Sequence, residues 1–414
     1  MTGSELVRGD RTDLNGPFLA RELLSLGLEP ARISIVGDAP GELAAAFGEG
    51  LQADICVVSG GLGPTHDDRT VELLAAAAGH DLVVDAELER QIEALSRAVA
   101  ERLGRPYTDF ADGVRKQATR PEPAVSIGLV GTAPGLVVPV EDRVAIVLPG
   151  PPWELRELWP RALETEPVQA LLARARRPSR RVLRFYGASE SAVAKALADA
   201  GGDGDGVEAT ICARDFEIHV DFVVEPGAEE RAQSLAAGLR RPLETYLFAE
   251  DERSVAKLVL DLCREQGLTL ATAESCTGGL VAARLTSVPG ASDVVLGAIV
   301  AYANAVKEAE LGVSPEVLLE HGAVSAETAA AMAAGARARL RADVGIGVTG
   351  VAGPGGGTAE KPVGLVHVHV ETPAASHGIE FSYGSDRDGI RRRATVAALH
   401  LARRLLSQSR DSSA

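Results

Sequence analysis

The sequence predicts an α/β protein with more than one domain. Short apolar runs typical of strands alternate with helical segments in both the N-terminal and the C-terminal parts of the chain, a pattern that favours parallel sheets covered by helices. The chain has 414 residues, which exceeds one typical domain and is long enough to bury two or three sizeable cores. Its composition, 46% hydrophobic and 24% charged, is that of an ordinary globular protein.

The first block runs from the N-terminus to about residue 170. Its apolar runs predict strands at 32–36, 55–59 and 144–148, and its helical spacing predicts helices at 16–26, 70–78 and 86–103. Because strands and helices alternate, we expect a parallel sheet with helices on its faces.

A smaller second block covers residues 178–247, and a third covers residues 254–407. The second is predicted to contain strands at 181–186 and 217–224, a helix at 190–198 and a glycine-rich acidic loop at 201–206. The stretch 244–253 is expected to be a linker. The third block is again α/β, with strands near 268–273, 294–302, 344–348 and 363–370 and a long last helix at 387–406.

Charge and cysteine usage exclude several classes of protein. The net charge is −16, which argues against broad nonspecific binding to nucleic acid. The sequence shows neither an apolar run near the roughly 20 residues that span a bilayer nor a signal-peptide pattern. The four cysteines are scattered, so neither a disulfide framework nor a zinc knuckle is expected, and a reducing cytoplasm is the simplest setting. Small nucleotides and further copies of the chain are the expected partners.

Lysine is rare in this chain. Only five of the 42 basic residues are lysines, so most positions that require only a surface charge carry arginine. The remaining lysines should be enriched at places that require a compact ammonium group. Lys116, Lys307 and Lys361 all fall in polar motif segments, although chance placement is the simpler alternative.

The run 271–279 is the most informative part of the third block. A predicted strand turns through Ser275, Thr277, Gly278 and Gly279 into a helical segment. A strand that enters a helix through such a turn exposes free backbone N–H groups, which suit a phosphate or a developing oxyanion. Thr349 and the glycines after it end another strand and offer a similar turn.

A serine and a lysine in the third block suggest nucleophilic catalysis. Ser292 follows a Pro-Gly pair, Tyr302 ends the next apolar run, and Lys307 lies in the first turn of the following helix. A partly desolvated lysine near a helix N-terminus can act as the base that activates a serine, and Tyr302 could orient the proton. Taken singly, the serine could be a plain turn residue, the tyrosine a core-edge residue and the lysine a solvated one. Cys276 has no evident histidine partner and is interpreted as a packing residue.

A second glycine-rich turn follows the strand at 55–59. Gly60, Gly61 and Gly63 allow close approach to phosphate, and Thr65 can cap the next helix. Asp67 and Asp68 are suited to a divalent cation that bridges phosphates, or they could simply complement the helix dipole. Further polar turns contribute the remaining candidates for a nucleotide pocket, which are Asp38, Lys116, Thr132, Gly150 and Glu154.

Taken together, the C-terminal motifs resemble the C-terminal domain of the CinA (competence/damage-inducible protein A) family. The runs that carry the resemblance are 272–279, 302–304, 322–325, 349–354 and 360–364. That domain is similar to nicotinamide-nucleotide amidase, which converts nicotinamide mononucleotide to nicotinate mononucleotide and ammonia. The resemblance implies a serine–lysine mechanism without a cofactor. Ser292 would be the nucleophile, although Ala291 stands where a second serine often precedes it, and Lys307 would be the base.

The same resemblance assigns the remaining site residues. Tyr302, Ser275 and Thr349 would assist catalysis. The substrate would be bound by the turns and by the family's basic segment, which would help to hold the phosphate; these residues are Thr277, Gly278, Gly279, Gly350, Gly353, Gly355, Arg387 and Arg391.

The first two blocks resemble the remainder of the same family. The first is similar to a molybdopterin-binding-like domain associated with metal-dependent ADP-ribose pyrophosphatase activity, and the second to a small α+β KH-like domain that lacks a basic GXXG loop. Family members usually begin with a strand that leads into a Gly-Thr-Glu-Leu turn, whereas this chain begins inside that turn. We therefore expect about six to eight further residues upstream, roughly one strand. The alternative to an enzyme is a noncatalytic nucleotide-binding protein that serves competence or DNA repair.

Overall fold

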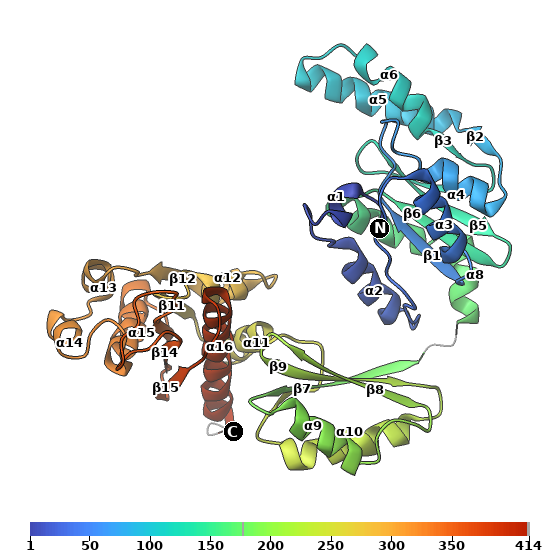
Figure 1. Ribbon diagram of the computed structural model, residues 1–414. Helices are drawn as coiled ribbons and strands as arrows, with labels where there is room; N and C mark the ends of the chain where they lie inside the picture. Colours follow the sequence, from blue (N-terminus) through green and yellow to red (C-terminus); the bar gives the residue numbers. More distant parts are fainter. Residues whose placement is uncertain (176–177, 412–414) are drawn as a thin grey trace. The chain divides into compact units, whose positions relative to one another are not determined.

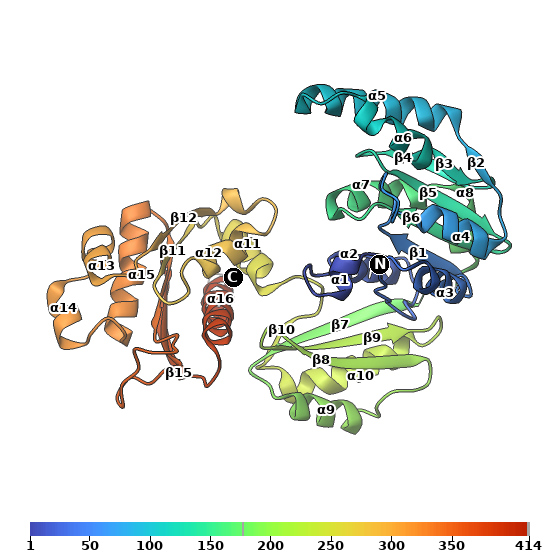
Figure 2. The ribbon, with the colours of Figure 1, turned by 45° about the horizontal axis from the view of Figure 1, so that its top comes forward.

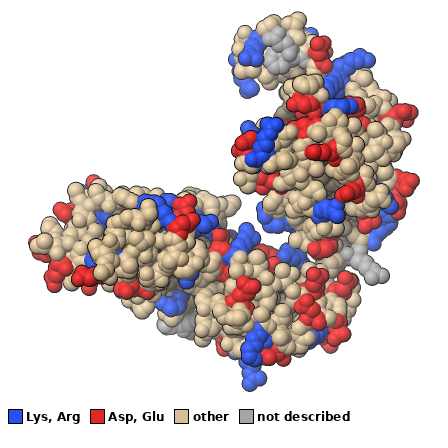
Figure 3. Space-filling model, in the orientation of Figure 1, with Lys and Arg blue, Asp and Glu red and all other residues tan. Residues whose placement is uncertain are grey.

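The computed structural model describes residues 1–175 and 178–411 (Figures 1 and 2). It forms two compact units, Met1–Ser179 and a second unit that begins at Arg180. In the described part of the chain, no helix combines the length and the apolar character needed to cross a membrane. On the face drawn in Figure 3, acidic and basic side chains are interspersed.

A four-stranded mixed sheet forms the centre of the first unit. Only β1 and β6 pair in parallel, whereas β6–β5 and β5–β4 are antiparallel, so the prediction of a parallel sheet holds for one pair. The reason lies in the connections, because tight turns join β4 to β5 and β5 to β6 and only antiparallel neighbours can be joined in this way. In sheet order the strands are β1 (Ile55–Ser59), β6 (Arg143–Leu148), β5 (Pro134–Val140) and β4 (Val125–Leu129).

Helices cover both faces of this sheet. Alternate residues of β6 enter two separate cores: Ile146 and Leu148 pack with α7 and α8, and Ala145 and Val147 pack with α3 and α4. The predicted helices α2 (Asn15–Ser25), α4 (Thr70–Ala78) and α5 (Ala86–Leu103) are confirmed. The apolar pattern did not predict the strands β4 and β5, nor α1 (Ser4–Val7), α3 (Pro40–Gly50), β2 (Leu82–Val84), α6 (Thr108–Gln117), β3 (Thr119–Pro121), α7 (Pro152–Leu163) and α8 (Glu166–Arg174).

The predicted strand at 32–36 is wrong. Only Val36 forms a bridge, to Thr2, while Ile33 and Ile35 are 50% and 43% exposed. Met1 and Thr2 lie between this segment and β1, since Thr2 N donates to Ser59 O and Val36 N donates to Met1 O. Two residues are too short a partner for a five-residue ladder, so the apolar run forms no strand.

The second unit begins with an antiparallel sheet covered by α9 (Glu190–Asp199) and α10 (Glu229–Leu243), with a core of its own. The expected linker at 244–253 is partly wrong, because Leu247–Ala249 is strand β10 and pairs with β7. The helix α10 and the strand β8 were not predicted from the sequence. In sheet order the strands are β10, β7 (Ser179–Tyr186), β9 (Glu217–Val224) and β8 (Val207–Arg214).

The C-terminal part of this unit contains a five-stranded sheet between two helical layers. Its first three strands are parallel and the last two are antiparallel. The four strands expected from the sequence are present, and β15 was missed. In sheet order the strands are β12 (Val295–Val300), β11 (Leu270–Glu274), β13 (Val344–Gly350), β14 (Leu365–Glu371) and β15 (Ser376–Ser382).

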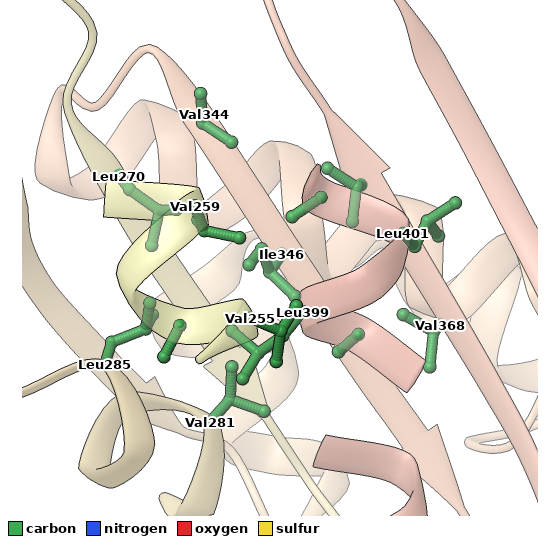
Figure 4. Packing of buried hydrophobic residues seen from close by; sticks show 14 of the residues in the cluster. Val255, Val259, Leu270, Val281, Leu285, Val344, Ile346, Val368, Leu399 and Leu401 are labelled. Carbon is green, nitrogen blue, oxygen red and sulfur yellow. The ribbon is translucent and has the colours of Figure 1, made fainter. Parts of the chain in front are cut away.

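Two helical layers bury the two faces of this sheet. One face packs against α11 (Val255–Gln266), α12 (Leu280–Thr286) and α16 (Arg387–Asp411), and Figure 4 shows Val259, Ile346 and Leu399 in that core. The other face packs against α13 (Asn304–Leu311) and α15 (Ala326–Leu340), with α14 (Pro315–Glu320) beside them. Gly347 lets α15 approach β13 closely, because a Cβ there would lie 2.1 Å from the Ala329 carbonyl oxygen.

Candidate active site

The candidate site lies where the three parallel strands of the C-terminal sheet end. Ser275 directly follows β11, Lys307 lies in the helix that follows β12, and Thr349 is the penultimate residue of β13. Because these strands are neighbours and run in the same direction, their carboxyl ends meet at one edge of the sheet. This is the edge at which open α/β sheets place their ligands.

Lys307 is the central side chain of this edge. It is only 1% exposed, and its Nζ donates to Ala301 O at 2.8 Å, to Tyr302 O at 3.2 Å and to Ser275 Oγ at 3.1 Å. All three acceptors are neutral oxygens. Burial lowers the pKa of the Lys307 ammonium from its usual value of 10.5, because removal from water disfavours the charged form.

The partners of Lys307 suit a neutral amine. Such an amine has two N–H donors and one lone pair, and the two carbonyls of Ala301 and Tyr302 take both donors. In this neutral form the direction of the contact with Ser275 reverses, and the lone pair accepts the proton of the Ser275 hydroxyl. The arrangement therefore pairs a nucleophile with a base, which is the geometry that covalent catalysis requires.

The predicted pairing of Ser292 with Lys307 is wrong. Ser292 is exposed on a short 3-10 helix, Ala291–Asp293, that lies before β12, whereas Lys307 lies after that strand. Six residues of strand separate the two ends by about 20 Å. Ser275, predicted only to assist, is the serine in contact with the lysine.

The turn after Ser275 is held from inside by Glu274. Its fully buried carboxylate accepts from Gly279 N, Val281 N and Ala282 N at 2.9–3.1 Å, and also from the Thr272 hydroxyl. Gly278 N donates to Ser275 O. The prediction that this turn presents free N–H groups is therefore wrong for Gly278 and Gly279.

Cys276 and Thr277 complete the turn, and both side chains are buried. Burial raises the pKa of the Cys276 thiol to about 12, so it stays protonated near neutral pH, in agreement with its interpretation as a packing residue. The Thr277 hydroxyl is buried and has no hydrogen-bond partner among the described residues.

The two arginines predicted to bind substrate, Arg387 and Arg391, hold the loops of the site. Arg391 donates to the carbonyls of Cys276 and Thr277. Arg387 donates to Gly353 O at 2.6 Å and to the Tyr302 hydroxyl at 2.9 Å. Since the Tyr302 hydroxyl bonds to Arg387 and the tyrosine is 61% exposed, the expected proton relay from Tyr302 to Lys307 is not present.

The turn after β13 contributes little free backbone to the site. The Thr349 hydroxyl donates to Ala323 O, Gly350 is still paired with Val366 in the sheet, and Val351 N donates to Leu365 O. Gly355 lies further out, on an exposed loop.

The three lysines that lie in polar motif segments have one feature in common, whereas Lys195 and Lys257 pair with Asp199 and Asp261 on their own helices. Lys116 donates to Thr65 O and Lys361 donates to His321 O, as Lys307 donates to two carbonyls. Each therefore fixes a loop through its backbone, a role for a compact donor group.

Several predicted residues of the first unit lie at the carboxyl ends of β1 and β6. The Gly60 and Gly150 turns touch, since a Cβ on Gly150 would lie 3.6 Å from Gly60 Cα, and Gly60 and Gly61 have positive φ angles of 104° and 65°. Glu154 is buried against Gly131, and burial raises its pKa. Asn15, which the sequence analysis missed, joins the two turns by donating to Ser59 Oγ and Gly150 O.

The other predicted residues of the first unit lie in polar turns. Asp68 accepts from both Thr65 N and Thr65 Oγ1, and a Cβ on Gly63 would clash with its carboxylate. Asp38 accepts from Ser4 at the N-terminal turn, and Thr132 is half-buried. Asp67 is exposed, and no group of three His, Cys, Asp or Glu side chains gathers for a metal among the described residues. A cation at Asp67 and Asp68 would need phosphate oxygens as further ligands.

The N-terminal and C-terminal parts of the chain each match a protein-family model, and the whole chain matches CinA-like proteins. Residues 252–406 match the model of the CinA C-terminal domain, and residues 1–167 match that of a probable molybdopterin binding domain. CinA-like proteins of Mycolicibacterium paratuberculosis and Mycobacterium tuberculosis are each 43% identical to the chain. The alignments cover 99% and 98% of this chain and 98% and 96% of those proteins.

Among solved structures, the chain is similar to a competence/damage inducible protein from Agrobacterium tumefaciens. That match is 42% identical, covers 37% of this chain and 96% of the other, and has a TM-score of 0.35. A CinA superfamily protein from Enterobacter cloacae is 31% identical, with 39% and 96% of the two chains covered and a TM-score of 0.36.

Proposed function

Since the chain belongs to the CinA family, we propose that its C-terminal domain hydrolyses the amide of nicotinamide mononucleotide, with Ser275 as nucleophile and Lys307 as base. The observation that carries the proposal is the buried 3.1 Å contact between Lys307 Nζ and Ser275 Oγ, in which no carboxylate among residues 1–175 and 178–411 pairs with the lysine. The choice of substrate rests on the resemblance of the C-terminal motifs to nicotinamide-nucleotide amidase.

The proposed reaction has two stages. Ser275 Oγ attacks the amide carbon while Lys307 takes its proton, and the resulting ammonium returns that proton to the departing nitrogen, which leaves as ammonia. A serine ester of the nicotinate nucleotide remains. Water, deprotonated by Lys307, then cleaves the ester, releasing nicotinate mononucleotide and restoring the Ser275 hydroxyl.

The direct test is release of ammonia and nicotinate mononucleotide from nicotinamide mononucleotide by the purified chain. We expect turnover in the presence of EDTA, because the proposed nucleophile and base are side chains that need no Lewis acid. Loss of activity on chelation, with recovery on adding zinc, would contradict this mechanism. No hydrolysis under any condition would favour a noncatalytic nucleotide-binding protein.

A second activity is proposed for the first unit, metal-dependent cleavage of ADP-ribose. It is favoured by the meeting of the Gly60 and Gly150 turns beside the buried Glu154, whose raised pKa suits proton transfer. We expect AMP and ribose 5-phosphate from ADP-ribose only when a divalent cation is added. The Glu154→Gln variant should retain the amide hydrolysis and lose this cleavage, and equal cleavage by wild type and variant would exclude a role for Glu154.

A further inference from the structure

The β8–β9 hairpin of the second unit has an unusual turn. Arg214 and Glu217 are paired, so Asp215 and Phe216 alone form the loop. Both have positive φ angles, 50° and 64°. Such two-residue turns normally carry Asn-Gly or another glycine-containing pair, because a side chain is strained in this conformation. A phenylalanine there is an outlier, and strain of this kind persists only where surrounding contacts hold it.

The contacts that hold this turn come from the C-terminal part of the second unit. Arg284 of α12 donates to Asp215 at 2.8 Å. The Phe216 ring meets the Tyr383 ring edge to face, with centroids 5.9 Å apart, and the Arg393 guanidinium lies 5.4 Å from Phe216 and 4.0 Å from Tyr383. The turn therefore contacts both α12 and α16.

The same two helices position the candidate site. Arg391, two residues before Arg393 on α16, holds the carbonyls of Cys276 and Thr277, which directly follow Ser275. Arg387, one turn earlier, holds Tyr302 and Gly353. The helix α12 begins at the end of the Ser275 turn. Further along α16, His400 Nε2 donates at 2.8 Å to the carboxylate of Glu217, which is the first residue of β9.

We propose that the Asp215–Phe216 turn is a positioning element for the Ser275 loop, so that turnover depends on the antiparallel sheet β10–β7–β9–β8 at the start of the second unit. The turn stores strain and presents Phe216 to Arg393, and this contact sets the position of the α16 segment that carries Arg387 and Arg391. The predicted effect on turnover rests on the proposed amide hydrolysis. The effect of the Asp215–Phe216 turn on the position of the Ser275 loop does not.

The test uses Phe216→Gly in the full chain. Glycine accepts a positive φ without strain, so the hairpin is retained while the contact with Arg393 is removed. We expect kcat for nicotinamide mononucleotide to fall roughly fivefold, with a smaller change in KM. Hydrogen exchange of the amides of residues 275–282 should become faster, while that of β13 is unchanged.

The matched control is Asp205→Gly, because Asp205 also has a positive φ, 51°, but lies in the exposed loop between α9 and β8. This variant should keep wild-type kcat and exchange rates. In addition, Asp215→Arg and Arg284→Asp should each lower kcat, and the double variant should recover it by re-forming the pair in reverse.

The proposal is overturned if Phe216→Gly matches Asp205→Gly in both kcat and exchange. If the wild-type chain shows no amide hydrolysis, the proposed function fails. The hydrogen-exchange rates of residues 275–282 still test whether the Asp215–Phe216 turn positions the Ser275 loop. Faster exchange in Phe216→Gly alone then supports it, and equal exchange rejects it.

Discussion

Replacing Ser275 by alanine should lower the rate of amide hydrolysis by about 10³-fold or more, whereas Ser292→Ala should stay within about twofold of the wild-type rate. Ser275 Oγ is the hydroxyl that faces the Lys307 amine, and the other hydrogen-bond partners of that amine among the described residues are backbone carbonyls. Ser292 is exposed at the opposite end of β12 and contributes no contact to the site. Ammonia release under saturating nicotinamide mononucleotide measures the difference.

Thermal unfolding provides the control for both serine variants. Each should unfold within a few degrees of the wild type, since neither removes a large apolar side chain. Mass spectrometry after rapid quenching adds a positive readout, because the serine ester should appear on the peptide that contains Ser275. An ester on the Ser292 peptide, or an inactive Ser292→Ala with an active Ser275→Ala, would reverse the assignment.

The Lys307→Arg variant should lose turnover by about 10³-fold or more, because arginine keeps its proton at every pH at which the protein is folded. In the wild type, the rate should rise with pH as Lys307 loses its proton. The midpoint should lie below 10.5, since burial lowers the pKa of this amine. A pH–rate profile of kcat/KM measures this. Near-normal ammonia release by Lys307→Arg would rule out the lysine base.

Lys307 should also affect stability in a predictable direction. Between the lowered pKa of the folded protein and the usual 10.5 of the unfolded chain, the unfolded chain binds a proton at Lys307 that the folded protein does not bind. The free energy of unfolding therefore rises with pH through this group. In Lys307→Met this contribution is absent, so urea unfolding across that interval should show a shallower rise than in the wild type.

The sequence was sufficient for the elements whose periodicity is local. The strands at 55–59 and 217–224 and the helices at 70–78 and 86–103 have the bounds expected from their apolar patterns. The segment 32–36 has an equally apolar pattern but forms no strand, because a strand also requires a partner of similar length. The order in which strands pair, and hence the mixed sheet of the first unit, depends on turn lengths that the pattern of apolar runs does not show.

The candidate site was predicted in part for a similar reason. Lys307 was identified because lysine is rare here and because this one follows a strand. Its partner was misassigned to Ser292, which is closer along the chain than Ser275. The topology of a parallel sheet separates the two serines. Residues that follow parallel strands meet at one edge of the sheet, and residues that precede them lie at the opposite edge. Ser275 and Lys307 each follow a strand, whereas Ser292 precedes one. The role of Glu274 was missed because an acidic residue beside a glycine turn resembles any surface carboxylate.

The carboxylate of Glu274 occupies backbone N–H groups of the Ser275 turn that a bound anion would otherwise use. The three N–H groups that it occupies are those that such turns offer to phosphate in nucleotide-binding proteins. A free anion would have to displace a ligand that is covalently tethered, at an effective concentration on the order of millimolar or more. In the proposed reaction we therefore expect the turn to disfavour the charged end of a nucleotide and to accept its uncharged amide. One acidic side chain decides whether this stretch of backbone captures an anion or presents a nucleophile.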